Sequence, residues 1–135
     1  MSATGPEWQT RLAVAIGEVG LAPALIERLA IYVRELARWS GCMSLTTLGP
    51  DGIVERLVAP SLAIATLEAY RVARSVADLG SGGGIPGIPL QIVAPRPRLV
   101  LIEARQRRAV FLRHVVRSLA LDGVEVVEGR GGRVR

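Results

Sequence analysis

Several residue types are scarce or absent in this sequence of 135 residues. It contains no lysine, so all 17 basic residues are arginine. The single cysteine, Cys42, excludes an intrachain disulfide and agrees with a reducing compartment. One cysteine and one histidine offer no spacing of metal ligands, and we predict no metal site. Aromatic residues make up 4% of the chain, which disfavours a module that binds single strands only by stacking on bases.

Long hydrophobic runs are missing as well. No stretch reaches the roughly eighteen apolar residues that a membrane-spanning helix needs. The first residues, MSATGPEWQT, have neither the basic nor the apolar region of a secretory signal. Hydrophobic residues make up 50% of the chain, which is enough for one domain with a real core. We therefore predict a single cytoplasmic domain over residues 1–135, with no membrane partner.

The charge balance is basic, with a formal net charge of +5. Arginine stacks on bases and binds phosphate through two parallel hydrogen bonds, so this balance favours an anionic partner such as nucleic acid. A GC-rich coding bias would produce the same excess of arginine, alanine, glycine and valine without a functional cause. The composition does not choose between these two explanations.

The first part of the chain, residues 1–70, has the apolar spacing of helices. Prolines and glycines near the ends mark three helical stretches, at 6–20, 23–40 and 53–67. The third is expected to break at Pro60, which lacks a backbone donor, and to restart with Ser61 as an N-cap. None of these stretches carries a catalytic constellation, so we interpret residues 1–70 as a helical packing layer.

Residues 71–135 change to the pattern of an α/β fold. Short apolar runs predict three strands, and the segments between them predict two helices: strands 75–79, 99–102 and 124–127, helices 86–94 and 105–119. This order is typical of the right-handed βαβαβ half of a doubly wound sheet. The predicted fold is therefore α/β, with amino-terminal helices followed by a partial Rossmann-like sheet.

The loop after the first strand, DLGSGGGIPGIPL, carries the strongest functional signal. Ligands of doubly wound folds bind at the carboxyl ends of the strands, and Gly80, Gly82 and Gly84 let a ligand lie against the main chain. The helix that begins near Pro86 has an amino end that favours negative charge. Glu103 ends the next strand, where it can accept hydrogen bonds from ribose hydroxyls. These features predict a nucleoside-type cofactor.

The same glycines fit two cofactor patterns. Residues 82–87 satisfy G-x-G-x-x-G, and Glu103 follows about 20 residues later, as in a dinucleotide site. Read from Asp78, the loop is D-x-G-x-G-x-G, the usual loop of S-adenosylmethionine methyltransferases. A carboxylate suits a cofactor with an ammonium and a sulfonium group better than a pyrophosphate. We favour the methyl donor and keep NAD, with an oxidoreductase function, as the alternative.

This loop and two later segments resemble one family. DLGSGGGIPGIPL, followed by LIEARQRRAVFLR and VEGR, is similar to the glucose-inhibited division protein B family, the guanine-N7 methyltransferases of small-subunit ribosomal RNA. The segment IYVRELARWSGCMSLT resembles the family's helix that ends in a tryptophan and a Leu-Thr pair. The resemblance implies a Rossmann-like methyltransferase fold that uses S-adenosyl-L-methionine and acts on small-subunit ribosomal RNA or a ribosomal particle.

The resemblance also implies which residues contact the cofactor. They are Gly80 and Ile85 in the loop, Glu103, and the pair Gly131 and Gly132 after VEGR. In the family this pair normally includes an acidic residue, so only backbone contacts are expected from it here. With the residues that the pattern supplies, the predicted cofactor-binding set is Asp78, Gly80, Gly82, Gly84, Ile85, Glu103, Gly131 and Gly132.

No catalytic residue is assigned. Guanine N7 has an exposed lone pair, so methyl transfer to it needs alignment and electrostatic support and no general base. His114 is predicted to be a surface or packing residue. A run of arginines is often only a solvated face, but four are candidates for contacts with RNA phosphates: Arg105, Arg108, Arg113 and Arg130.

Family members continue for several more strands and helices, so the resemblance implies that the C-terminal half of the fold is missing. In a sheet of order 3-2-1-4-5, strand 75–79 would then lack a neighbour and expose a hydrophobic edge. We therefore expect either a homo-oligomer formed through this strand or a chain that is only marginally stable. Two functions fit the resemblance: an rRNA methyltransferase, and a non-catalytic remnant that binds cofactor or RNA.

Overall fold

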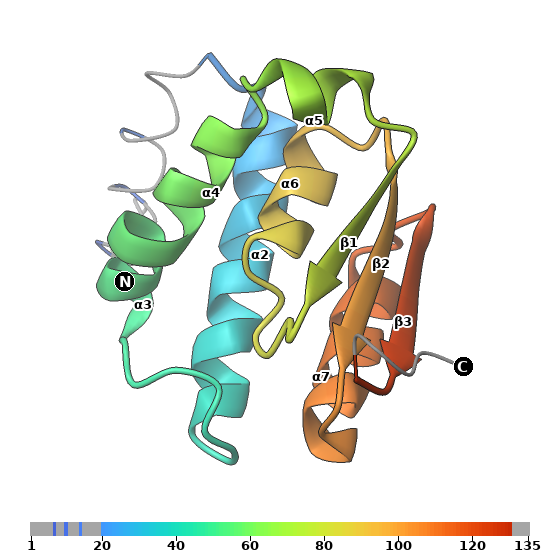
Figure 1. Cartoon of the computed structure of the whole chain (residues 1–135). Helices are drawn as coiled ribbons and strands as arrows, with labels where there is room; N and C mark the ends of the chain where they lie inside the picture. The colour runs from blue at the N-terminus through green and yellow to red at the C-terminus, as the bar shows by residue number, and fades with distance from the viewer. Residues whose placement is uncertain (1–6, 8–9, 11–13, 15–19, 131–135) are drawn as a thin grey trace.

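The structure is a computed structural model that describes residues 7, 10, 14 and 20–130. In this part of the chain, helices pack against one face of a small parallel sheet (Figure 1). Most of the predicted helix at 6–20 lies outside the described residues. The same holds for Gly131 and Gly132, so the structure does not place these two predicted cofactor contacts.

The longest described helix is α2 (Pro23–Ser40). Pro23 lies in its first turn, where the missing amide hydrogen costs nothing, and Gly41 follows its last residue. Its buried residues recur three and four positions apart: Leu29, Tyr32, Val33 and Leu36. This spacing puts them on one helix face, which packs against the rest of the core. The prediction for 23–40 is confirmed.

The second helical region differs from the prediction. It consists of α3 (Pro50–Ile53), the π-helical turn η1 (Val54–Val58), α4 (Ala59–Ile64) and α5 (Glu68–Val72). The expected break at Pro60 is wrong, because the chain continues directly from η1 into α4. In the wide π turn the Ala59 amide donates to the Val54 carbonyl. This turn lets the helical chain continue through Pro60, which has no amide hydrogen to donate. Ser61 is not an N-cap, since its hydroxyl donates backwards to the Leu57 carbonyl at 2.6 Å.

The sheet confirms the predicted α/β class. Its three parallel strands are β1 (Ser75–Leu79), β2 (Arg98–Glu103) and β3 (Val124–Glu128), in the order β1-β2-β3. The crossover helices are α6 (Gly87–Val93) and α7 (Gln106–Ser118). In the register of the sheet, Glu103 lies beside Glu128. All three strands therefore end at the same edge of the sheet, where the loops that follow them meet (Figure 1).

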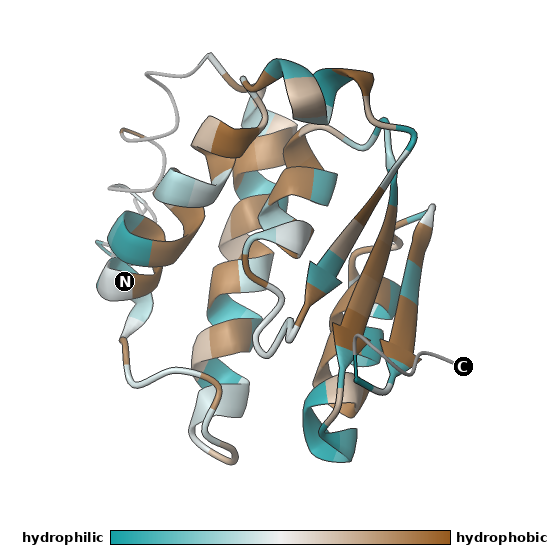
Figure 2. Ribbon diagram, viewed as in Figure 1, coloured by the Kyte–Doolittle hydropathy of each residue, from teal (hydrophilic) through white to brown (hydrophobic). Residues whose placement is uncertain are grey.

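One core joins the helices to the sheet. Helix α2 contacts both α6 and α7, and apolar side chains from every layer form a single buried cluster. Figure 2 shows hydrophobic residues along the helices and strands where these layers meet. Alternate residues of β2, Leu99 and Leu101, belong to this cluster, together with Ile88 of α6 and Phe111 of α7. The core thus fixes α2 against α6 and α7.

Candidate functional site

The glycine-rich loop leaves β1 and is tied at once to β2. The amides of Gly80 and Ser81 donate to the Ile102 carbonyl at 2.8 and 3.2 Å. The Ser81 hydroxyl donates to the Asp78 carbonyl at 2.8 Å, and the Gly84 amide donates to the Ser81 carbonyl at 2.7 Å. The loop is therefore a hydrogen-bonded turn in a defined conformation.

Glycines in this loop serve two purposes. Gly80 has a φ of +66°, and an added Cβ there would meet no atom within 4 Å, so its outer side is open to a ligand. Gly84 has a φ of +89°, and an added Cβ would lie 2.5 Å from Ile88 Cδ1 and 3.2 Å from Leu112 Cδ2. A side chain at Gly84 would therefore collide with the core. The loop is open on one side and closely packed on the other.

Asp78 lies under this loop and is half-buried. Its Oδ2 accepts a hydrogen bond from the Gly87 amide at 3.1 Å. Burial raises the pKa of Asp78 to about 6, and the hydrogen bond from Gly87 opposes that rise. Pro86 is the N-cap of α6 and does not lie inside its first turn as the sequence suggested. The amide at the start of α6 thus already holds a carboxylate, which disfavours a phosphate and the dinucleotide pattern.

Glu103 ends β2 and is buried, with 4% of its surface exposed. Its Oε1 accepts the Gly82 amide at 3.0 Å, and its Oε2 accepts the Arg105 amide at 2.7 Å. The carboxylate therefore links the glycine loop to the start of α7. Each oxygen retains a second lone pair that can accept a hydrogen bond. Its role toward ribose hydroxyls stays a prediction.

Helix α2 supplies a contact that the sequence did not reveal. Tyr32 is fully buried, and its hydroxyl donates to the Gly83 carbonyl at 2.6 Å. Complete burial and, to a lesser extent, the charge of Asp78 raise the pKa of Tyr32 well above its usual value. The phenol therefore stays protonated and remains a donor. Apolar periodicity marks Tyr32 as a core residue but does not show where its hydroxyl points.

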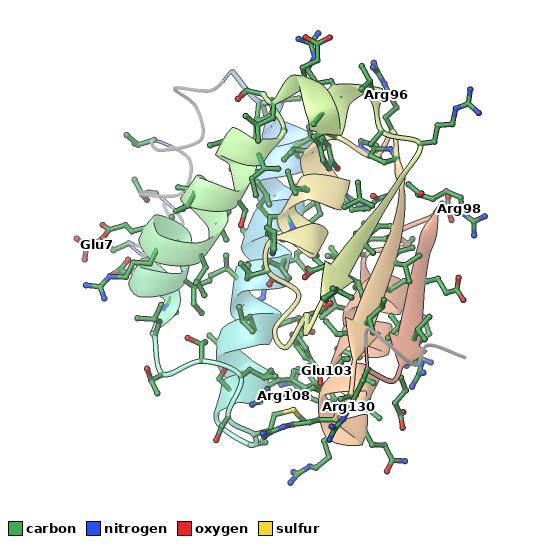
Figure 3. All side chains as sticks on the ribbon, in the orientation of Figure 1. Glu7, Arg96, Arg98, Glu103, Arg108 and Arg130 are labelled. Atoms are coloured by element: carbon green, nitrogen blue, oxygen red, sulfur yellow. The ribbon has the colours of Figure 1, made fainter. Side chains whose placement is uncertain are left out.

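Three of the four candidate RNA-binding arginines lie at the carboxyl end of the sheet. Arg105 precedes α7 and Arg130 follows β3; both are exposed. Figure 3 shows Arg108 and Arg130 near Glu103. The Arg108 guanidinium donates to the Ser44 carbonyl at 3.0 Å. Arg113 lies further along α7 and pairs with Glu128 at 3.7 Å.

A cleft of about 380 Å³ lies beside these arginines. It is lined by the loop after α2 and the beginning of α7: Cys42, Met43, Ser44, Arg105, Gln106, Arg107 and Arg108. Its rim is basic, because three of these seven side chains are arginines. An anionic polymer that reached the glycine loop from this side would meet positive charge.

His114 packs against the aromatic ring of Trp39, with ring centroids 5.0 Å apart. Its Nε2 is 3.3 Å from Glu35 Oε1, so it bridges α7 and α2. Among the described residues no cluster of three or more His, Cys, Asp or Glu could hold a metal ion. No helix in the described part of the chain is long and apolar enough to cross a membrane.

Comparison with known proteins gives one consistent family. The model of the family described as rRNA small subunit methyltransferase G matches residues 25–133. The chain is 41% identical over 107 residues to "Ribosomal RNA small subunit methyltransferase G" of Rubrobacter xylanophilus, covering 79% of this chain and 40% of that protein. The protein of the same name from Xylella fastidiosa is 38% identical over 130 residues, which are 96% of this chain and 60% of the relative.

A third relative with this name, from Polynucleobacter asymbioticus, is 35% identical over 125 residues, covering 88% of this chain and 56% of its own length. The chain thus spans 40 to 60% of the length of the three relatives. The similarity extends through the helical layer, the glycine loop and all three strands.

Proposed function

Because the chain belongs to the rRNA small subunit methyltransferase G family, we propose that its glycine loop binds S-adenosyl-L-methionine. The observation that carries this proposal is the position of Asp78, whose carboxylate already occupies the amide at the start of α6. A negative group there repels a pyrophosphate and attracts an ammonium or sulfonium group. The family and the local electrostatics therefore favour the same cofactor.

The residues present fit this cofactor. Asp78 would attract its cationic end, and the open side of Gly80 and Gly82 would admit it against the main chain. Ile85 would contribute apolar surface, and the buried Glu103 would accept hydrogen bonds from the ribose. Gly84 lies on the side of the loop that packs against Ile88 and Leu112 of the core. We keep Gly131 and Gly132, which lie outside the described residues, as proposed backbone contacts.

The proposed reaction is transfer of a methyl group to N7 of a guanine in small-subunit ribosomal RNA. The cofactor supplies an electrophilic methyl group when it is bound. The guanine nitrogen already carries a lone pair, so the task of the protein is to align the two reactants and to exclude water. Such a role requires no general base.

Calorimetric titration tests the cofactor proposal. We expect S-adenosylhomocysteine to bind and NAD not to bind, because Asp78 stands where a pyrophosphate would need an amide. Binding of NAD alone would favour the oxidoreductase alternative. Failure of both ligands to bind would overturn the proposed site.

RNA is the proposed partner, and Arg105, Arg108 and Arg130 are the proposed contacts at the edge where the cofactor would lie. Arg113 is proposed as a weaker contact, since it is partly neutralised by Glu128. Transfer of labelled methyl groups to undermodified small ribosomal subunits tests the activity. Cofactor or RNA binding without transfer would instead support the non-catalytic alternative. Ribosomal RNA also implies a cytoplasmic location, which we propose with it.

A homo-oligomer through β1 is a separate proposal. Within the described residues β1 pairs only with β2, so its other edge is open. Leu79 on this strand is 64% exposed, which is unusual for a leucine in a sheet. Light scattering should show a dimer that Leu79→Lys converts to a monomer. A monomeric parent chain with a sharp cooperative melt would contradict this proposal.

A further inference from the structure

The glycine loop is held from two directions. From the sheet, Glu103 accepts the Gly82 amide at 3.0 Å. From the helical layer, Tyr32 donates to the Gly83 carbonyl at 2.6 Å. The Gly82 amide thus has its hydrogen-bond partner on β2, and the Gly83 carbonyl has its partner on α2. The loop cannot shift toward either side without breaking one of these bonds.

Packing supports the contact from α2. One turn after Tyr32, Leu36 is 1% exposed and lies directly against the loop. A Cβ added to Gly83 would be only 2.8 Å from Leu36 Cδ1. The absence of a side chain at Gly83 therefore lets α2 approach the backbone closely enough for Tyr32 to reach the carbonyl. Helix and loop fit each other at this point.

The hydroxyl of Tyr32 has no alternative partner in water, because the residue is 0% exposed. A buried donor that loses its acceptor is costly, so the bond to Gly83 strongly favours one loop conformation. The raised pKa of Tyr32 keeps the donor hydrogen in place over the whole physiological range. Tyr32 itself contacts the rear of the loop and leaves the open side of Gly80 free.

We propose that Tyr32 is a positioning residue that holds the glycine loop in its cofactor-binding conformation through the Gly83 carbonyl. The helical layer thereby contributes to cofactor affinity without touching the cofactor. The expected effect of Tyr32 on cofactor binding rests on the proposed function. The effect of Tyr32 on the loop can be measured without any ligand.

The chain contains a matched control at the opposite end of the sheet. Tyr70 of α5 is also buried, with 9% of its surface exposed, and its hydroxyl donates to the Ala94 carbonyl at 3.0 Å. Tyr70→Phe and Tyr32→Phe each remove one hydroxyl that donates to a backbone carbonyl. Only Tyr32→Phe removes a contact to the glycine loop.

Amide hydrogen exchange of the unliganded chain is the first test. The amides of Gly80, Gly82 and Gly84 are hydrogen-bonded, so their exchange reports on opening of the loop. Tyr32→Phe should speed their exchange about five- to tenfold, as expected for loss of one buried hydrogen bond. Tyr70→Phe should leave these amides unchanged. Equal acceleration by both variants, or none by Tyr32→Phe, would overturn the proposal.

Titration with S-adenosylhomocysteine is the second test. Tyr32→Phe should weaken binding by roughly five- to tenfold, and Tyr70→Phe should retain the parent affinity. If the parent chain does not bind S-adenosylhomocysteine, the proposed function fails, whereas the exchange experiment still decides the role of Tyr32. Loss of affinity without faster exchange would assign Tyr32 a direct role and contradict positioning through the loop.

A second variant covers the possibility that Tyr32→Phe does not fold. Leu36→Met conserves volume and alters the side chain that packs on Gly83. It should speed exchange of the same loop amides by about two- to threefold, a smaller effect because no polar group is left unpaired. Unchanged exchange in a folded Leu36→Met variant would contradict the proposed contact between α2 and the loop.

Discussion

The two ends of the sheet differ in whether carboxylates take part in their side-chain hydrogen bonds. At the carboxyl end, Asp78 and Glu103 accept hydrogen bonds from backbone amides. At the amino end, Tyr70, Gln91 and Arg96 donate to backbone carbonyls at 3.0, 3.0 and 3.4 Å. Side chains donate hydrogen bonds at both ends, and the carboxyl end also holds the partly or fully buried carboxylates of Asp78 and Glu103.

This difference has an energetic meaning. A carboxylate loses hydration when it is buried, and a few amide bonds compensate only in part. The raised pKa of Asp78, to about 6, shows that the compensation there is incomplete. A cationic ligand would complete it.

Gly84→Ala and Gly123→Ala compare two glycines with positive φ, at +89° and +75°. Gly84 is in contact with the core, whereas a Cβ on Gly123 would meet only Gln91 Nε2, at 3.7 Å. We expect Gly84→Ala to lower the free energy of unfolding by about 3 kcal/mol and Gly123→Ala by about 1 kcal/mol. Urea denaturation measures both. Similar losses would show that the loop is not closely packed.

Glu103→Gln and Glu128→Gln change two residues that lie side by side in the sheet. Glu103 accepts two backbone amides, whereas Glu128 is 41% exposed and has only a surface ion pair with Arg113. The side-chain amide nitrogen of glutamine cannot accept a hydrogen bond. Glu103→Gln should therefore lower the free energy of unfolding by about 2 kcal/mol and weaken the binding of S-adenosylhomocysteine. Glu128→Gln should cost at most about 0.5 kcal/mol. Thermal melts measure the stability of the two variants, and calorimetry measures their affinity. Equal effects of the two substitutions would contradict this prediction.

Asp78→Asn should affect stability and binding in opposite directions. Because the pKa of Asp78 rises from 3.8 to about 6 on folding, the folded state binds the proton more tightly. The stability that this group contributes is therefore complete below about pH 4 and is lost as the pH rises through 6. Allowing for partial exposure, we expect Asp78→Asn to stabilise the chain by roughly 1 kcal/mol at pH 7.5 and not at pH 4.

The same substitution should weaken the binding of S-adenosylhomocysteine about tenfold at pH 7.5, since it removes the charge that would pair with the ammonium group of the ligand. The parent affinity should rise with pH between 5 and 7, and that of Asp78→Asn should not. The exposed Asp122, near the amino end, provides the control. Asp122→Asn should change neither the stability nor the affinity for S-adenosylhomocysteine. A parent affinity independent of pH would argue against Asp78 as a ligand group.

Arg105→Gln and Arg98→Gln should have the smallest effect on stability, since both side chains are exposed. The two residues lie at opposite ends of the sheet. If RNA binds at the carboxyl end, Arg105→Gln should weaken its binding about threefold and lower the salt dependence by roughly one counterion. Arg98→Gln should have less effect. Filter binding at several salt concentrations distinguishes the two ends, and a larger effect of Arg98→Gln would reverse our assignment.

Much of the fold could be predicted from local pattern. The strand 75–79 has the same bounds in the structure, and the helix at 23–40 is confirmed because a proline and a glycine mark its ends. The π turn at 54–58 was missed, since hydrogen-bond spacing inside a helix leaves no trace in apolar periodicity. Pro60 suggested a break that the neighbouring turn made unnecessary.

The candidate site was predicted less completely. The order of residues along the chain predicted Asp78, the loop glycines and Glu103 as cofactor contacts, and this remains a prediction. The sequence did not show that Asp78 binds the amide of Gly87, nor that Tyr32 reaches Gly83 across 51 positions of sequence. The contact of Tyr32 depends on how α2 packs against the loop, which packing of the whole core sets.

The sequence by itself determined the family, the order of strands and helices, and the presence of an acid before a glycine-rich loop. These features are local, because they follow from backbone preferences and side-chain spacing over a few residues. Only the tertiary structure decided which end of the sheet buries carboxylates and which helix supports the loop. Those decisions depend on desolvation and on hydrogen bonds between distant segments, which exist only after the core has brought those segments together.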